Sequence, residues 1–544
     1  MKLLIIFCFL WFAQVFSQPA GSQPAGFFPQ AGATENVWVF FTDKENVEFD
    51  PFAFFHPKAI ERRLRHGQDL FDEIDFPVRA DYLQTIAGMV DSLDVVSRWF
   101  NAISVYASPL QLEALERLDF VDRIEYMTLN LLPAAYTTEE EPIISKFSTK
   151  DMELLLAHTA HLKGRWFHKN GFDGQGIRIA IFDAGFPGVD NHPAFKDILS
   201  ENRIVATRDF VRNRQGVFHK NSHGTSVMSV IGGRIDSIPI GLATGAEFLL
   251  ARTETWTESF SEEKNWLAAV EWADQHGADI INSSLGYTRH RYFPEDMDGN
   301  SSLVARAAAI AFQKGMLIVN AAGNEGGIES WKIIGTPADA PEVLSVGAVD
   351  FPSLLRADYS SRGPTADGRL SPSVSALGTV YAAGKSGFKR IQGTSFASPL
   401  LAGFAACLWQ MHPDWTNQQV FDAMQQSATL FPYFDYSHGY GIPQADFFFR
   451  NKSLEIQPTF EFEITKDTLK VVSRLKVIND KGLDRQDRYL YYQVRDASDR
   501  VMEYFVLLAT ETEILKLNLS DFEQGKKILV HLAGYTSAWT FLNQ

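Results

Sequence analysis

The sequence predicts an α/β protein built on a doubly wound parallel sheet, with a small α+β unit before it and a β-sandwich-like unit after it. Between residues 161 and 450, apolar runs alternate with segments of helical periodicity, which is typical of a parallel sheet with helices on both faces. Residues 36–128 mix strand and helix patterns, and residues 456–544 alternate apolar with polar side chains. A chain of 544 residues is also too long for one core.

The first 35 residues indicate a leader and a spacer. Residues 1–17 have one lysine at the start, a short apolar core and small residues before Gln18, which is typical of a secretory signal peptide. The apolar run is shorter than a bilayer-spanning helix requires. Residues 18–35 repeat Gln-Pro-Ala-Gly and predict a flexible linker. We therefore expect a secreted protein, periplasmic or extracellular, without membrane contact once the signal is removed.

Local sequence patterns predict the α+β unit at 36–128 and the segment after it. Apolar runs predict strands at 37–41, 96–105 and 121–127, and helical patterns predict helices at 57–66 and 109–118. Residues 129–160 then carry proline, threonine and an acidic run, so we expect an exposed linker that contains the maturation site.

The central region carries the strongest signal for a parallel sheet. Two segments with helical periodicity, 262–276 and 301–314, are each closed by a glycine. Buried strands are predicted at 177–182, 248–251, 280–283, 316–320 and 343–349. Ligands of such sheets gather at the carboxyl ends of the strands, and Asp183, Ser284 and Asn324 each lie at or just past such an end.

Three short motifs place an acid, a base and a hydroxyl in fixed order along the chain. They are 181–185, with Asp183, 222–225, with His223, and 393–399, with Ser395. A serine hydroxyl becomes a good nucleophile when an imidazole removes its proton, and a carboxylate holds that imidazole in one tautomer. Each motif alone is as well explained by a turn or by tight packing. Together, in the order Asp, His, Ser, they indicate a serine hydrolase.

The chain resembles the subtilase family. Three further segments, 282–286, 321–326 and 359–364, look like the remaining signatures of that family and occur in its usual order. The resemblance implies a subtilisin-type fold over about 161–450, and it identifies the unit at 36–128 as a propeptide that folds as an intramolecular inhibitor. A permanent N-terminal domain is the alternative for that unit.

The resemblance also implies roles for individual residues. Ser395 is the expected nucleophile, His223 the general base and acid, and Asp183 the residue that orients the imidazole. The side-chain amide of Asn324 is the expected oxyanion donor. Substrate is expected to bind along the segments that contain Ser284, Leu285, Gly286, Gly323 and Gly335, with Gly335 at the floor of a pocket of broad specificity.

One residue departs from the family pattern. Family members carry Ser or Thr after the aspartate, where the hydroxyl orients the carboxylate, and this chain has Ala184. The sequence therefore does not show which groups orient the carboxylate of Asp183.

Composition argues against nucleic acid as a partner and leaves calcium binding as an open alternative. The formal net charge of −16 argues against nucleic acid, which requires clustered Lys and Arg. Of the two cysteines, only Cys407 remains after signal removal, so we expect a buried thiol and no disulfide. We expect the protein to require no cofactor, and the sequence assigns no residue as a metal ligand. The acidic loop 296–300 has oxygen ligands that calcium prefers, and a solvated loop is the alternative.

The leading hypothesis is a secreted, monomeric endopeptidase that acts on protein or peptide substrates and is made as an autoprocessed precursor. Two alternatives stay open: a catalytically silent peptide-binding scaffold, and an esterase or peptide ligase that uses the same acyl-enzyme. For the C-terminal unit, the sequence leaves a sorting, a substrate-binding and a packing role open.

Overall fold

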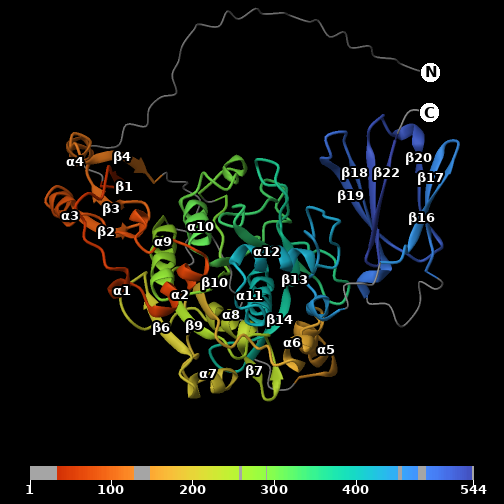
Figure 1. Cartoon of the computed structure of the whole chain (residues 1–544), viewed down its shortest axis with the longest axis horizontal. Helices are drawn as coiled ribbons and strands as arrows, with labels where there is room; N and C mark the ends of the chain where they lie inside the picture. Colours follow the sequence, from red (N-terminus) through yellow and green to blue (C-terminus); the bar gives the residue numbers. More distant parts are fainter. Residues whose placement is uncertain are drawn as a thin grey trace, which may run out of the picture.

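A seven-stranded sheet organises the central part of the chain in the computed structural model (Figure 1). The structure describes residues 34–127, 147–255, 260–289, 291–450, 456–475 and 485–541. The predicted signal segment, most of the first linker and residues 129–146 of the second lie outside these ranges. Within the described residues, no helix is both long and apolar enough to cross a membrane.

All neighbouring strands of the central sheet are parallel, in the order β13-β12-β11-β10-β5-β9-β6. The chain runs from β5 outward to β6, returns to β9, and then crosses to β10, so the strand order reverses beside β5. The five predicted strands are confirmed. The strands are β5 (Arg178–Asp183), β6 (Ile204–Asp209), β9 (Glu247–Arg252), β10 (Ile280–Ser283), β11 (Leu317–Ala321), β12 (Val343–Val349) and β13 (Val374–Leu377).

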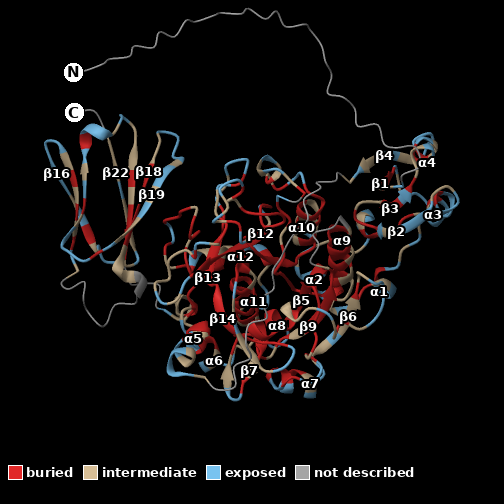
Figure 2. Cartoon of the chain, turned by 180° about the vertical axis from the view of Figure 1, so that it is seen from behind, coloured by how far each residue is buried: buried red, intermediate tan, exposed pale blue. Residues whose placement is uncertain are grey.

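Helices cover both faces of this sheet, so the predicted doubly wound fold is confirmed. Alternate residues of β5 show the two faces: Ile179 and Ile181 join one core, and Ala180 and Phe182 join the other. The first core contains α8 (His223–Gly232) and α11 (Thr394–Met411), and the second contains α9 (Phe260–Gln275) and α10 (Leu303–Gln313). Figure 2 shows that buried residues concentrate around this sheet and its helices.

Smaller elements complete the central region. The helix α5 packs against β14 and brings Leu154 and Leu155 into the first core, so residues 149–160 belong to the central region and not to the exposed linker expected at 129–160. The helix α12 follows α11. These elements are α5 (Thr149–Ala160), α6 (Arg165–Lys169), α7 (Lys196–Ser200), α12 (Asn417–Gln426), β7 (Arg234–Ile235), β8 (Ile238–Pro239), β14 (Thr379–Ala383) and β15 (Phe388–Gln392).

The N-terminal unit is a four-stranded antiparallel sheet in the order β2-β3-β1-β4, with helices against it. One face of β1 packs on the unit's own helices, and the other face brings Trp38 and Phe40 into the core formed by α9 and α10. The elements are β1 (Glu35–Phe41), α1 (Pro51–Phe54), α2 (Pro57–Arg65), α3 (Ala80–Ala87), β2 (Ser92–Ser97), β3 (Ala102–Ala107), α4 (Pro109–Leu115) and β4 (Val121–Tyr126).

The C-terminal unit consists of two antiparallel sheets that share one apolar core, as the β-sandwich prediction requires. It meets the central region where Tyr433 packs against Tyr491. The sheets have the orders β16-β17-β20 and β19-β18-β21-β22, with β16 (Phe460–Thr465), β17 (Thr468–Ser473), β18 (Tyr489–Arg495), β19 (Val501–Leu508), β20 (Glu513–Asn518), β21 (Lys527–Leu532) and β22 (Tyr535–Thr540).

Candidate active site

The carboxyl end of β5 and the start of α8 bring the acid and the imidazole together. Asp183 is the last residue of β5, and His223 is the first residue of α8. The Nδ1 atom of His223 lies 2.9 Å from Oδ2 and 3.0 Å from Oδ1 of Asp183. The carboxylate is fully buried, whereas the imidazole keeps 12% of its side-chain area exposed. A buried carboxylate on Nδ1 leaves Nε2 as the nitrogen that can exchange a proton with a reactant.

A glycine lets these two elements approach closely. A Cβ atom added at Gly224 would lie 2.6 Å from the carbonyl oxygen of Gly185 and 2.9 Å from Cβ of Asp183, so a larger residue would push the acid away. Gly224 therefore makes room for the segment that carries Asp183.

Ser395 lies in the first turn of α11, and the residue after it packs against the imidazole. The ring of Phe396, the next residue, is centred 5.2 Å from the ring of His223. The Ser395 Oγ atom donates a hydrogen bond to the carbonyl oxygen of Ser284 at 3.1 Å, and the Ser284 hydroxyl donates to the Ser395 carbonyl oxygen at 2.9 Å. The first turn of α11 also supplies backbone N–H groups that favour developing negative charge.

Pro399 explains why the Ser395 carbonyl is available to Ser284. In a regular helix this carbonyl accepts from the N–H of the residue four positions later, which here is a proline without an N–H. Pro399 is the sixth residue of α11, past the first turn, where helical N–H groups lack partners in any case. Its effect is to leave the Ser395 carbonyl without a helical donor.

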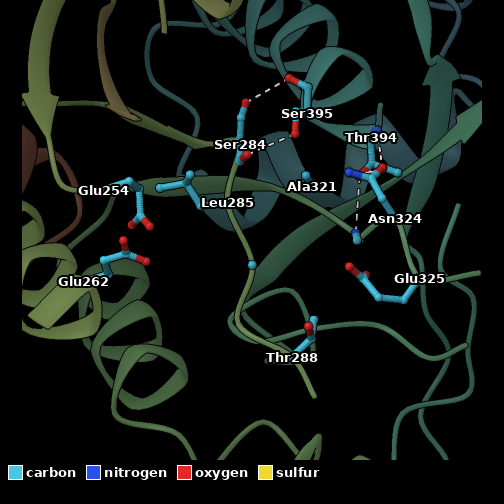
Figure 3. Close-up of a pocket in the computed structure, with 12 residues that line it drawn as sticks. Glu254, Glu262, Ser284, Leu285, Thr288, Ala321, Asn324, Glu325, Thr394 and Ser395 are labelled. Carbon is cyan, nitrogen blue, oxygen red and sulfur yellow. Dashed lines mark hydrogen bonds between the residues drawn. The ribbon is translucent and has the colours of Figure 1, made fainter. Parts of the chain in front are cut away.

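Asn324 is oriented by Thr394, the residue that precedes Ser395. Its Oδ1 accepts hydrogen bonds from the backbone N–H of Thr394 at 2.9 Å and from the Thr394 hydroxyl at 3.0 Å. With its oxygen held in this way, the amide has its Nδ2 donors left for the pocket that it lines (Figure 3). Gly323 beside it has a φ of 114°, in the region that favours glycine.

Ser395 and Asn324 line one pocket of about 580 Å³, counting the space at its open mouth. Segments after β10 and β11 form two of its sides, and the start of α11 closes a third (Figure 3). Its lining residues are Glu254, Glu262, Ser284, Leu285, Gly286, Thr288, Ala321, Gly323, Asn324, Glu325, Thr394 and Ser395.

Gly335 does not line this pocket, contrary to the expectation that it forms the floor. The side chain of Thr288 occupies the space beside it, since a Cβ atom added at Gly335 would lie 2.8 Å from the Thr288 methyl group. The two strands are paired there, with the Tyr287 N–H bonded to the Thr336 carbonyl at 2.9 Å. The small residue therefore makes room for Thr288, which supplies the pocket wall.

Two glutamates at one side of the pocket were not predicted. Burial, and next the charge of Glu262, raise the pKa of Glu254 well above its usual value. The Tyr287 hydroxyl donates to Glu254 at 2.8 Å, and the Thr255 N–H donates to Glu262 at 2.8 Å. The sequence offered no signal for this pair, because acidic residues near the start of a helix are as well explained by solvation and the helix dipole.

The loop proposed for calcium uses Asp298, one of its two acidic residues, in a turn. Asp298 accepts hydrogen bonds from the N–H groups of Asn300 and Ser301, at 2.8 and 2.7 Å. In the part of the chain that the structure describes, no group of three or more His, Cys, Asp or Glu side chains is arranged to hold a metal ion.

Comparison with known proteins identifies the family. The model of the subtilase family matches residues 174–441, and that of a peptidase S8 propeptide domain from Bacteroidota matches residues 36–142. Subtilisin from Bacillus pumilus is 30% identical over 272 residues, covering 50% of this chain and 90% of that protein. Subtilisin E from Bacillus subtilis (strain 168) is 30% identical over 273 residues, covering 50% of this chain and 65% of that protein.

Among solved structures, a cold adapted subtilisin-like serine proteinase is similar to this chain at 26% identity, with a TM-score of 0.40, over 50% of this chain and 89% of that one. The chain belongs to the subtilase family of serine peptidases and carries a propeptide domain of that family.

Proposed function

We propose that this subtilase is a secreted serine endopeptidase that uses Asp183, His223 and Ser395 as its triad. His223 takes the proton of Ser395 Oγ as that oxygen attacks the carbonyl carbon of the substrate, and Asp183 stabilises the imidazolium. The backbone N–H of Ser395 and Nδ2 of Asn324 bind the oxyanion. His223 then protonates the leaving amine, and water hydrolyses the acyl-enzyme by the same sequence of proton transfers.

One observation carries this proposal: a buried carboxylate holds Nδ1 of His223, the residue after Ser395 packs against that imidazole, and the Ser395 hydroxyl and the oriented Asn324 amide line one pocket. The test is amide hydrolysis by the matured protein. Ser395→Ala should lose turnover, while Ser353→Ala, at a serine that does not line the pocket, should keep it. Turnover by Ser395→Ala equal to that of the wild type would refute the role of Ser395, and no turnover by either protein would favour the scaffold hypothesis.

The reaction products separate the proposed peptidase from the other alternative. With a protein substrate, a peptidase releases new amino and carboxyl ends. An esterase would act on a short ester and leave the protein intact, and a ligase would join the acyl group to an added amine-bearing peptide. With casein as the substrate, we expect new amino and carboxyl ends to form. Their amount should stay the same when an amine-bearing peptide is added.

The charge of the pocket indicates which substrates it accepts. Glu254, Glu262 and Glu325 line it, and none of its described lining residues is Lys or Arg. We therefore expect peptides with a glutamate at the position that enters the pocket to have a lower kcat/KM than the glutamine analogues. Equal values at every position around the scissile bond would contradict this expectation.

The propeptide domain supports a further proposal, self-processing. After removal of residues 1–17, the domain at 36–128 would inhibit the enzyme until a cut within the predicted linker at 129–160, before the buried helix α5 that begins at Thr149. Ser395→Ala should then accumulate as a longer species that retains the N-terminal domain. Trimming of this variant at the wild-type rate, in a host lacking other proteases, would show that another enzyme makes the cut.

A further inference from the structure

The backbone beside the catalytic carboxylate is tied to the neighbouring strand at two points. Asp183, at the end of β5, is the register partner of Arg252, at the end of β9. The N–H of Thr253 donates to the carbonyl oxygen of Asp183 at 2.9 Å, and Nε of Arg252 donates to the carbonyl oxygen of Ala184 at 2.9 Å. The second bond comes from the Arg252 side chain, which reaches across the strand ends to Ala184. This is the position where family members carry Ser or Thr.

Arg252 is itself fixed on its other side. Its Nη1 lies 3.1 and 3.2 Å from the two carboxylate oxygens of Asp209, which ends β6 and is the register partner of Arg252. Asp209 is fully buried and Arg252 is 5% exposed. The N–H of Arg212 also donates to Asp209 at 3.1 Å, and Arg214 and His219 lie 3.5 Å from its carboxylate. Asp183, Arg252 and Asp209 thus form one row across three neighbouring strand ends.

This row acts on the carboxylate through the backbone. The N–H of Ala184 donates to Oδ1 of Asp183 at 2.7 Å, so the orientation of the carboxylate depends on where the peptide groups around Ala184 lie. The alanine side chain cannot form hydrogen bonds, whereas a guanidinium can donate to a carbonyl and a carboxylate at the same time in a rigid plane. Asp209 also balances the positive charge of Arg252 next to a site where an imidazolium has to form.

We propose that Arg252, held by Asp209, is a positioning residue that fixes the Asp183–Gly185 turn and thereby the orientation of the catalytic carboxylate. This inference rests on the proposed peptidase function. Misplacing a catalytic group by about 1 Å can cost about a hundredfold in rate. Loss of Arg252 should therefore lower kcat while KM, which depends on the pocket, changes little.

The chain offers a matched control at the opposite end of the same two strands. Arg178 begins β5, is also 5% exposed, and pairs with Glu247 of β9 at 2.9 Å. Arg178→Gln thus removes a buried arginine from the same pair of strands but far from the carboxyl edge. Arg252→Gln, Asp209→Asn and Arg178→Gln should be matured with one added protease, so that self-processing does not affect the comparison, and counted with a fluorophosphonate titrant.

Arg252→Gln and Asp209→Asn should lower kcat about ten- to a hundredfold with KM within about twofold of the wild type. Arg178→Gln should keep kcat within about twofold, whatever its loss in melting temperature. An unchanged kcat for Arg252→Gln in an active wild-type background, or an equal loss for Arg178→Gln, would overturn this inference alone. A wild type that neither turns over substrate nor takes up the titrant would instead refute the proposed function, and this inference with it.

Discussion

Asn324 divides its polar atoms between two tasks. Its oxygen accepts two hydrogen bonds from Thr394, and its amide nitrogen has donors left for the pocket. Because the hydrogen-bond partners of the oxygen are on the residue next to the nucleophile, the donor and the hydroxyl are fixed relative to each other. A donor placed in this way stabilises charge that develops only in the transition state.

Asn324→Ala should therefore reduce kcat by about two to three orders of magnitude with little change in KM, the range known for this same donor in subtilisin itself. Thr394→Val is the companion variant, because it removes one of the two bonds that orient the amide and should cost less. Steady-state kinetics on a peptide amide check both. A kcat for Asn324→Ala within a few fold of the wild type would remove the amide from the proposed oxyanion site.

At the residue scale, the sequence predicted those groups whose signal is local. Asp183, His223, Ser395 and Asn324 each lie in a short motif; the structure pairs Asp183 with His223, packs Phe396 against that imidazole, and lines one pocket with Ser395 and Asn324. Arg252 was not predicted, because its role depends on the register between β5 and β9, which separates it from Asp183 by 69 positions in the chain. Thr288 likewise replaces Gly335 in the pocket wall through a strand pairing that no local pattern reveals.

At the scale of elements, the helix α2 joins the propeptide domain to α9 through buried charges. Arg62 and Arg63 are fully buried, and they lie 2.5 and 2.8 Å from the two carboxylate oxygens of Asp274. Arg98 adds a third contact at 2.7 Å. Burial raises the pKa of Asp274, but the arginines outweigh it and hold that pKa well below its usual range. The carboxylate therefore stays charged in the interface.

Arg63→Gln should destabilise this interface, because it leaves a buried carboxylate with one cation fewer. We expect the free energy of unfolding of the full-length Ser395→Ala chain to fall by about 3 kcal/mol. Arg65→Gln, at an exposed position of the same helix, should change it by less than about 0.5 kcal/mol. Urea unfolding compares the two variants. Equal effects would mean that the buried pair contributes nothing specific.

Element prediction succeeded where the burial pattern was simple. The fully buried strands β5, β10, β11 and β12 appear in the sequence as apolar runs. The edge strand β6 was missed because most of it is only half-buried, and β13 was missed because it is short and contains a serine in a Ser- and Pro-rich stretch. For the helix α3 we have no comparable physical account of the miss.

At the scale of the whole molecule, each of the three regions contains a histidine whose pKa is lowered by burial. The values are about 4 for His66 in the propeptide domain, about 3 for His158 in the central region and about 4 for His531 in the C-terminal unit. His158 illustrates the cause: its side chain is fully buried, which disfavours the charged imidazolium, and its Nε2 accepts from the N–H of Tyr381 at 3.0 Å.

These histidines predict loss of stability in mild acid. Between pH 6.5 and about 4 the unfolded chain binds more protons than the folded one, so stability is complete above pH 6.5 and falls below it. For the well-buried His158 and His531, each pH unit in this window costs about 1.4 kcal/mol per histidine. The melting temperature of the Ser395→Ala chain should therefore drop steadily from pH 6.5 to pH 5. A melting temperature that stays constant over this range would contradict the prediction.

The account depends most on the claim that His223, oriented by Asp183, activates Ser395. Labelling of the matured protein with a fluorophosphonate, followed by mass-spectrometric mapping of the modified residue, measures this directly. We predict one label on Ser395, none on Ser395→Ala, and labelling of His223→Gln slowed at least about a hundredfold. A label on another residue, or a His223→Gln variant that reacts at the wild-type rate, would contradict the account.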